Sequence, residues 1–517
     1  MKISKLVPLP LLVLAIFPLG FARGDVTLPA VVGSHMVLQR DLPLPIWGWA
    51  DPGEEVTVVF GKQKATAKAD VSGKWQVKLD PIPAGEALEM TITGKNTIKL
   101  TDILMGEVWV GSGQSNMQWS VMQSVDGAKE IADAKYPKIR LFSVPLIPSG
   151  APARDVNARW AECSPETVGR FSAVLYFFGR DLQKSLDVPV GLINTSWGGT
   201  RIEPWIPPAG FASQKALKKD LDALRGQLTG YQDVLKANIK ILRPWFEIAE
   251  KAAAAGETIP DPPALPAHPL NSNNASTGLY NGMVHPLVPF AIRGAIWYQG
   301  ESNRGAGMYY HELMKGLIQG WRTVWGQGDF PFLFVQLAPY KYGGSETALP
   351  EIWEAQTATL AVPNTGMAVT TDIATVNDIH PPNKQDVGKR LALWALAKTY
   401  GKSDVVYSGP QYDSMAVELD EVRIKFKHAE GGLAIRDDNP LSWFTIAGAD
   451  KKFVPASVTI SGDTVVVRSD KVSTPVAVRF GWHQLAEPNL TNKAGLPAIP
   501  FRTDAWNDAL PDFPGDK

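Results

Sequence analysis

The sequence predicts an α/β protein whose central domain is a parallel sheet with helices on both faces, flanked by two β-rich domains. Between about residues 101 and 403, apolar runs typical of buried strands alternate with helical patterns. Before and after this region, short runs rich in β-branched residues alternate with turn residues. In addition, uncharged polar residues follow several predicted central strands, where such a sheet places its binding site.

Length and charge narrow the class of protein. A chain of 517 residues exceeds one ordinary core, so two to four domains are expected. The 51 basic and 52 acidic residues are spread along the chain, with no basic block that would indicate nucleic acid as a partner. The 17 tryptophans favour carbohydrate weakly, because indole rings stack on sugar rings.

The N-terminus has the pattern of a signal peptide over residues 1–22. Lys2 and Lys5 precede an apolar stretch, and small residues allow cleavage after Ala22. Prolines interrupt the stretch and no later segment is apolar for long enough to cross a bilayer, so no membrane anchor is expected. Cys163 is the only cysteine, which suits a bacterial exported protein, periplasmic or secreted, better than a eukaryotic secretory route.

Each predicted domain has its own pattern. Residues 25–100 contain three good strands at 56–60, 75–79 and 90–93, which suggests a small sandwich of immunoglobulin-like size. Residues 404–517 are β-rich again. The predicted strands and helix of the central domain (101–403) are 107–110, 138–142, 188–194, 292–298, 330–337 and 365–371, with a helix at 171–185.

The central pattern is interrupted between residues 207 and 280. Residues 214–255 predict one or two charged helices, and 260–269 is Pro-rich. This segment is interpreted as an insertion near the rim of the site, either a lid or substrate wall or a structural addition.

Ser115 is the candidate nucleophile. It lies in Gly-Ser-Gly-Gln-Ser-Asn-Met (111–117), directly after the first central strand. A serine on a tight strand-to-helix turn can hold its hydroxyl at the sheet edge, close to backbone N–H groups. A Gly/Ser loop with a capping serine is the competing interpretation of this stretch alone.

A serine nucleophile needs a base, and His380 is the candidate. Histidine suits this role near neutral pH, and the sequence has seven. The other six fall in the β domains, in or beside the insertion, or in a helical pattern. His380 alone follows the last central strand, with Asp378 two residues and Asp372 eight residues before it.

Four ordered blocks resemble the sialate O-acetylesterase family, a branch of the SGNH (GDSL-like) hydrolases. They are Gly-Gln-Ser-Asn-Met (113–117), Ser-Trp-Gly-Gly-Thr (196–200), Trp-Tyr-Gln-Gly-Glu-Ser-Asn (297–303) and Asp-Ile-His-Pro-Pro-Asn-Lys (378–384). The resemblance implies a flavodoxin-like three-layer α/β/α domain that hydrolyses acetyl esters on sugars. It implies no metal and no cofactor.

The resemblance also implies roles for residues. Ser115 would be the nucleophile and His380 the base. The oxyanion would be held by the backbone N–H of Ser115, a backbone N–H of Gly198 or Gly199, and the side-chain amide of Gln299, with Asn303 as the alternative.

The sequence departs from the usual pattern of the wider superfamily at positions 114 and 377. Gln114 stands where an aspartate usually precedes the serine, and Asn377 stands where the aspartate that orients the histidine is usual. Asp378 is therefore the first candidate for the orienting acid and Asp372 the second. A Ser–His pair assisted only by a backbone carbonyl is the third.

Other residues of the blocks are expected at the substrate or in the site loops: Gln114, Asn116, Trp197, Arg201 and Glu301. Arg201 could meet a sialic acid carboxylate, although a salt bridge with Glu203 is the simpler expectation. Glu301 is expected to hold site loops together by hydrogen bonds.

The sequence therefore predicts a serine esterase acting on O-acetylated carbohydrate, first of all sialic acid. An esterase of acetylated xylan or another polysaccharide with the same mechanism is the alternative, and a non-catalytic carbohydrate-binding protein is a third. A metallohydrolase is disfavoured because no cluster has metal-ligand spacing. The oligomeric state is left open.

Overall fold

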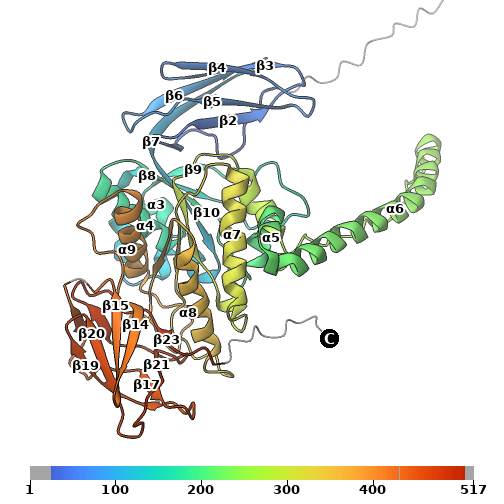
Figure 1. The fold of residues 1–517 in the computed structure, drawn as a ribbon. Coiled ribbons are helices and arrows are strands. Elements are labelled where there is room, and N and C mark those ends of the chain that lie inside the picture. The colour runs from blue at the N-terminus through green and yellow to red at the C-terminus, as the bar shows by residue number, and fades with distance from the viewer. Residues whose placement is uncertain (1–24, 430, 507–517) are drawn as a thin grey trace, which may run out of the picture.

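The computed structural model describes residues 25–429 and 431–506, so the predicted signal peptide (1–22) lies outside the described residues. A mixed sheet forms the centre of the molecule (Figure 1). In the order in which they lie, its strands are β13 (Thr365–Ala368), β12 (Phe332–Val335), β11 (Gly294–Tyr298), β7 (Thr97–Gly113), β10 (Val190–Asn194), β8 (Tyr136–Ser143) and β9 (Trp160–Cys163). All neighbours pair in parallel except β8 and β9.

The strand order confirms the predicted fold class. Taken in chain order, β7, β10, β11, β12 and β13 lie as 2-1-3-4-5, which is the flavodoxin-like order, and β8 and β9 extend the β10 edge. The chain leaves β7 towards one side of the sheet and later returns to build the other side from β11. Ligands of such sheets bind where the strand order reverses, at the carboxyl ends of β7 and β11.

Helices cover both faces of the sheet (Figure 1). On one face α4 (Ala173–Leu186) packs against α9 (Lys384–Trp394), and on the other α7 (Tyr309–Trp325) packs against α5 (Pro208–Ser213) and α8 (Ala348–Ala358). Asn383 caps the start of α9, since its Oδ1 accepts a 3.1 Å hydrogen bond from the backbone N–H of Asp386.

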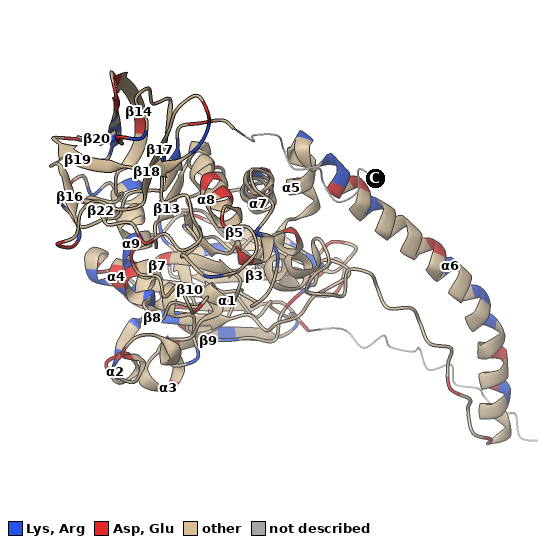
Figure 2. Ribbon diagram, turned by 90° about the horizontal axis from the view of Figure 1, so that it is seen from below, with Lys and Arg blue, Asp and Glu red and all other residues tan. Residues whose placement is uncertain are grey.

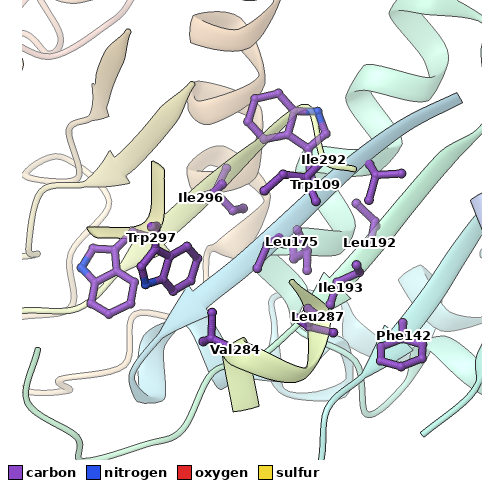
Figure 3. Close-up of a cluster of buried hydrophobic side chains, with 14 of the residues drawn as sticks. Trp109, Phe142, Leu175, Leu192, Ile193, Val284, Leu287, Ile292, Ile296 and Trp297 are labelled. Carbon is purple, nitrogen blue, oxygen red and sulfur yellow. The ribbon is translucent and has the colours of Figure 1, made fainter. Parts of the chain in front are cut away.

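The core lies between these layers. All residues of β7 from Ile103 to Gly113 are buried, as expected for a strand covered on both faces. Trp109 of β7 contacts Phe178 of α4 edge-on, with ring centroids 5.0 Å apart. Figure 3 shows Trp109 among Leu192 of β10, Ile292 and Ile296. This packing holds β7 and its site-bearing end in a fixed position.

β7 also belongs to the N-terminal domain. Its first part pairs antiparallel with β6 (Leu88–Thr93), and residues 104–106 pair with β1 (Val37–Gln39). The remaining strands of this domain are β2 (Leu44–Trp49), β3 (Glu55–Phe60), β4 (Gln63–Lys68) and β5 (Lys74–Leu79). Because one strand of 17 residues runs through both parts, the expected boundary at residue 100 falls inside β7.

The insertion is dominated by one helix, α6 (Lys218–Ala255), which projects away from the body together with the chain that returns from it (Figures 1 and 2). No helix among the described residues is long and apolar enough to cross a membrane.

The C-terminal domain is a β structure with its own apolar core. One of its sheets has the order β14 (Gln411–Glu418), β15 (Glu421–Lys427), β20 (Thr464–Arg468), β19 (Ser457–Ser461). The other has the order β18 (Val454–Pro455), β17 (Phe444–Ala447), β21 (Ala477–Phe480), β23 (Phe501–Arg502), and β16 (Leu433–Ile435) pairs with β22 (Leu490–Asn492).

Candidate active site

The end of β7 places Ser115 at the junction of three site loops. Gly113 lies opposite Tyr298 of β11, and the backbone N–H of Gln114 donates to the Tyr298 carbonyl at 3.0 Å. On the other side, the N–H of Trp197 donates to the Gly113 carbonyl at 3.0 Å. Gly113 has φ 136°, and a Cβ there would lie 2.2 Å from the Tyr298 carbonyl oxygen, so only glycine fits this turn.

Ser115 and His380 meet directly. The distance from Ser115 Oγ to His380 Nε2 is 2.8 Å, although 265 positions separate the residues in the sequence. This is the contact through which a histidine can take the proton of a serine nucleophile. Ser115 begins the short helix α1 (Ser115–Gln118), and His380 lies on the loop before α9.

Neither candidate acid reaches the other nitrogen of His380. Asp378 Oδ1 accepts a 2.9 Å hydrogen bond from the backbone N–H of His380. Asp372 forms a two-point ion pair with Arg390, with both contacts at 2.6 Å. No carboxylate or carbonyl among the described residues hydrogen-bonds Nδ1 of His380. Asp378 therefore shapes the loop that carries the histidine, and Asp372 is held by α9.

The imidazole is oriented by packing. The Trp119 indole stacks on the His380 ring, with centroids 4.8 Å apart and planes 17° from parallel. Burial lowers the pKa of His380 below its usual range, and nearby Lys384 lowers it further, whereas Asp378 raises it. The histidine is therefore kept neutral, as a base must be, to a lower pH than a free imidazole.

Two of the expected oxyanion donors are available and one is occupied. The N–H of Ser115 has no acceptor among the described residues, as expected for the first residue of a helix. The N–H of Gly199 likewise has none. The N–H of Gly198, in contrast, donates to Gln118 Oε1 at 2.8 Å. A Cβ on Gly198 would lie 3.3 Å from Ser115 Cβ, so this N–H borders the nucleophile.

The two amide side chains expected at the oxyanion are both engaged elsewhere. Gln299 is fully buried, and its Nε2 donates to the Thr200 carbonyl at 3.2 Å and to Asn303 Oδ1 at 2.8 Å. Asn303 Nδ2 donates to Glu203 Oε2 at 3.1 Å. Because every amide hydrogen of Gln299 has an acceptor, the structure assigns this side chain to bracing the loops after β10 and β11 instead.

A buried polar network lies behind the Ser–His pair. Asn116 Nδ2 donates to Glu301 Oε1 at 2.5 Å and to the Ile379 carbonyl at 3.0 Å, and Asn116 Oδ1 accepts from Lys384 Nζ. Burial lowers the pKa of the fully buried Lys384 to about 7 and raises that of Glu301. The bond between Asn116 and Glu301 links the nucleophile turn to the loop after β11, and Asn116 also ties that turn to the histidine loop.

The remaining expected site residues lie around this centre. Gln114 Oε1 accepts from the N–H groups of Gly300 and Ser302, each at 3.3 Å, so it anchors the loop after β11. The Trp197 carbonyl accepts a 2.8 Å hydrogen bond from Thr200 Oγ1. Arg201 forms an ion pair with Glu203, with Nη2 2.6 Å from Oε1, and half of its side chain is exposed. The structure thus shows the salt bridge between Arg201 and Glu203 that was the simpler expectation.

Sequence reasoning missed three residues of the site, Gln118, Trp119 and Lys384. A signal was present for the first two only. Gln118 and Trp119 follow the nucleophile by three and four positions, so in a helix they lie on its face. Lys384 ends the fourth block, but a lysine at a helix start is usually solvated, and nothing in the sequence indicates its burial.

The described residues contain no group of three or more His, Cys, Asp or Glu that could hold a metal ion. What they do contain is a serine in hydrogen-bond contact with a histidine whose pKa is lowered by burial, next to two backbone N–H groups without an acceptor among the described residues. Such an arrangement can attack a carbonyl carbon and hold the resulting oxyanion.

Known proteins resemble this chain over most of its length. Residues 265–397 match the family of sialic acid-specific acetylesterases among the carbohydrate esterases. Sialate O-acetylesterase of Rattus norvegicus is 33% identical over 495 residues, which cover 87% of this chain and 88% of that protein. The Homo sapiens enzyme is 29% identical over 518 residues, 91% of each chain.

A solved structure agrees with this match. A carbohydrate acetylesterase from Xanthomonas citri superposes with a TM-score of 0.79 at 37% identity, covering 93% of this chain and 100% of that one. The resemblance derived from the four sequence blocks is thereby confirmed. The chain belongs to the sialate O-acetylesterase family, and it is a carboxylic ester hydrolase of the carbohydrate acetylesterase type.

Proposed function

We propose that this protein removes O-acetyl groups from sialic acids by nucleophilic catalysis with Ser115 and His380. The observation that carries the mechanism is the 2.8 Å contact between Ser115 Oγ and His380 Nε2. The substrate class is supported by the sialate O-acetylesterases that match most of the chain.

In the first half of the reaction, Ser115 Oγ attacks the acetyl carbonyl carbon while His380 Nε2 takes the hydroxyl proton. The oxyanion of the tetrahedral intermediate accepts hydrogen bonds from the N–H groups of Ser115 and Gly199. Each such donor is typically worth about 10²–10³-fold in rate. The sugar oxygen then leaves with the proton from Nε2, and acetyl-Ser115 remains.

In the second half, His380 Nε2 takes a proton from water as the water oxygen attacks the acetyl carbon. Collapse of this intermediate breaks the bond to Ser115 Oγ, which regains its proton, and acetate departs. Because no side chain among the described residues holds Nδ1, the orientation of the imidazole in both steps comes from its stacking on Trp119.

A neutral acetylated polysaccharide is the second candidate substrate. Two observations favour it. Arg201, the candidate partner for a sialic acid carboxylate, is already paired with Glu203, and the solved relative from Xanthomonas citri carries the broader description of carbohydrate acetylesterase. A neutral sugar would need no free guanidinium.

The test is acetate release from an O-acetylated sialic acid and from acetylated xylan, side by side, with Ser115→Ala as the control. Release from the sialic acid with none from xylan would support the first candidate, and the reverse would favour the second. Ser115→Ala should fold normally and release no acetate. Turnover by that variant at the wild-type rate would refute the mechanism.

We also propose that the protein is exported. The N-terminal pattern that supports export lies outside the described residues, so the support comes from the sequence alone. Mass spectrometry of the protein recovered from the periplasm of an expressing bacterium should show cleavage after Ala22. Recovery of full-length protein in the cytoplasmic fraction would contradict export.

A further inference from the structure

Two arginines lie in the loops that follow β10 and β11, and their guanidinium groups differ in what they bind. Arg201 follows β10, and Arg304 follows β11. On Arg201, Nη1 donates to the Ser302 carbonyl at 3.4 Å, while Nε and Nη2 donate to Glu203 Oε1 at 3.1 and 2.6 Å. A carbonyl thus takes one end of this guanidinium, and a carboxylate takes the edge formed by Nε and Nη2.

Arg304 has the first of these contacts and lacks the second. Its Nη1 donates to the Gly343 carbonyl at 3.3 Å. Its Nε and Nη2 have no acceptor among the residues that the structure describes, and neither atom is buried. The edge that Arg201 uses for a carboxylate is therefore free on Arg304. This edge matches the spacing of the two oxygens of a carboxylate, so it can bind one through two parallel hydrogen bonds.

The Arg304 guanidinium is held in position by neutral groups. Its Cζ lies 4.6 Å from the centre of the Tyr342 ring, whose face attracts a cation and leaves the N–H groups of the guanidinium free. The bond to the Gly343 carbonyl fixes the same group from one end. A side chain that is already positioned loses less conformational freedom when a ligand binds, which favours binding.

Arg304 belongs to the loop that contacts the nucleophile turn. Two residues before it, the backbone N–H of Ser302 donates to Gln114 Oε1 at 3.3 Å, and Gln114 directly precedes Ser115. The backbone N–H of Arg304 donates to the Glu301 carbonyl at 3.3 Å, which closes the turn between them. These bonds keep the arginine on the β11 side of the nucleophile.

The segment that the Arg304 side chain contacts, residues 338–347, lies next to the loop that carries the base. The backbone N–H of Lys341 donates at 2.9 Å to the carbonyl of Val376, four positions before His380. The arginine is therefore placed where the loops after β11, β12 and β13 meet. This is the carboxyl edge of the sheet, which also carries the Ser–His pair and where such folds bind their ligands.

We propose that Arg304 binds the carboxylate of the acetylated sugar through Nε and Nη2 while Ser115 attacks the acetyl group. This inference rests on the proposed function and names the residue that makes the enzyme prefer an acidic sugar. Two kinds of substrate offer the same carboxylate, namely a sialic acid and a uronic acid of an acetylated polysaccharide. A neutral sugar has no group that pairs with this edge.

The test compares each acetylated sugar acid with its own carboxamide, which has nearly the same shape and no charge. The full protein is assayed for acetate release from an O-acetylated sialic acid, an O-acetylated glucuronic acid and the carboxamide of each. The quantity measured is the ratio of kcat/KM for the acid to kcat/KM for the amide. For the preferred sugar, we expect a ratio of about 10–100, in line with charge-assisted hydrogen bonds. A preference in the sialic pair alone would identify sialic acid, and one in the glucuronic pair alone a uronic acid.

Arg304→Met should bring this ratio to about 1, because the paired hydrogen bonds and the charge are lost together. Damage to the fold would lower both rates and leave the ratio as it was. Arg304→Lys keeps the charge without the two-point edge and should retain only part of the ratio. The matched control is Arg201→Met, which should keep the wild-type ratio because Glu203 already occupies that guanidinium.

Two results would overturn the role of Arg304 and leave the esterase function standing. One is an equal kcat/KM for acid and amide with both sugars in the wild-type protein. The other is an equal fall of the ratio in Arg304→Met and Arg201→Met, which would assign the preference to net charge. Absence of acetate release from every sugar substrate would instead refute the proposed function itself.

Discussion

Gln118 Oε1 accepts a 2.8 Å hydrogen bond from the backbone N–H of Gly198, directly beside the nucleophile. This N–H is one of the donors that the family resemblance assigns to the oxyanion. It can serve a substrate only when the Gln118 side chain moves away. In the free enzyme, the Gly198 N–H is therefore occupied by the Gln118 side chain.

We expect Gln118→Ala to raise kcat/KM by up to about tenfold, because the substrate oxyanion would no longer displace a hydrogen bond worth about 0.5–1.5 kcal/mol. Steady-state kinetics with an aryl acetate measures this. The control is Gln123→Ala, five positions further along the chain, whose side chain hydrogen-bonds Ser120 and no candidate oxyanion donor. A tenfold fall with Gln118→Ala would show instead that this side chain braces the loop after β10.

Asp378→Asn tests whether an aspartate orients His380. Because Asp378 contacts the backbone N–H of the histidine and not its ring, we expect kcat to fall by less than about tenfold. Loss of a true orienting aspartate costs about 10⁴-fold. Single-turnover kinetics at pH 7.5 distinguishes the two, and a fall of three orders of magnitude or more would place Asp378 on Nδ1 in the working enzyme.

The pH profile should report the neighbours of His380. His380 can act as a base only when neutral. The value of kcat/KM should therefore be at its maximum above the pKa of His380 and should fall as the pH drops through that pKa. Burial and Lys384 lower this pKa below its usual value of about 6.5. The acid limb should therefore lie below pH 6.5, and a limb above pH 7 in the wild-type enzyme would contradict this assignment.

Two substitutions should move that limb in opposite directions. Lys384 lowers the pKa of His380, so Lys384→Met should shift the limb to higher pH. Asp378 raises this pKa, so Asp378→Asn should shift the limb to lower pH. Lys384 has a pKa of about 7 and is charged where His380 titrates. Shifts in the same direction for both variants would show that they act through the fold and not through charge.

Asn116 should matter for stability as well as for rate. Asn116→Ala removes the partner of Lys384 Nζ and of Glu301 Oε1 and leaves both buried groups without it. We expect the free energy of unfolding to fall by about 2–4 kcal/mol, measured by urea denaturation. Ser115→Ala serves as the control and should unfold at the same urea concentration as the wild type.

Local sequence determined where the strands and helices lie, and which residues follow the strands at the site. Apolar runs of strand length predicted β7, β10, β11 and β12, and the helical pattern at 171–185 predicted α4. These features depend on side-chain chemistry within a few residues, so they can be predicted without knowing the rest of the fold. The edge strand β9 is short and pairs antiparallel, and no local pattern indicated it.

The sequence by itself also determined the family, because four ordered blocks bring the same polar residues to the ends of β7, β10 and β11 and to the loop before α9. Only the tertiary structure decided which hydrogen-bond partners these residues have. Gln299 is committed to Thr200 and Asn303, and Gln118 occupies Gly198, because strands paired in this register bring those atoms within reach. The burial of Lys384 likewise arises only when α9 closes over the turn at Asn116, a contact across 268 positions.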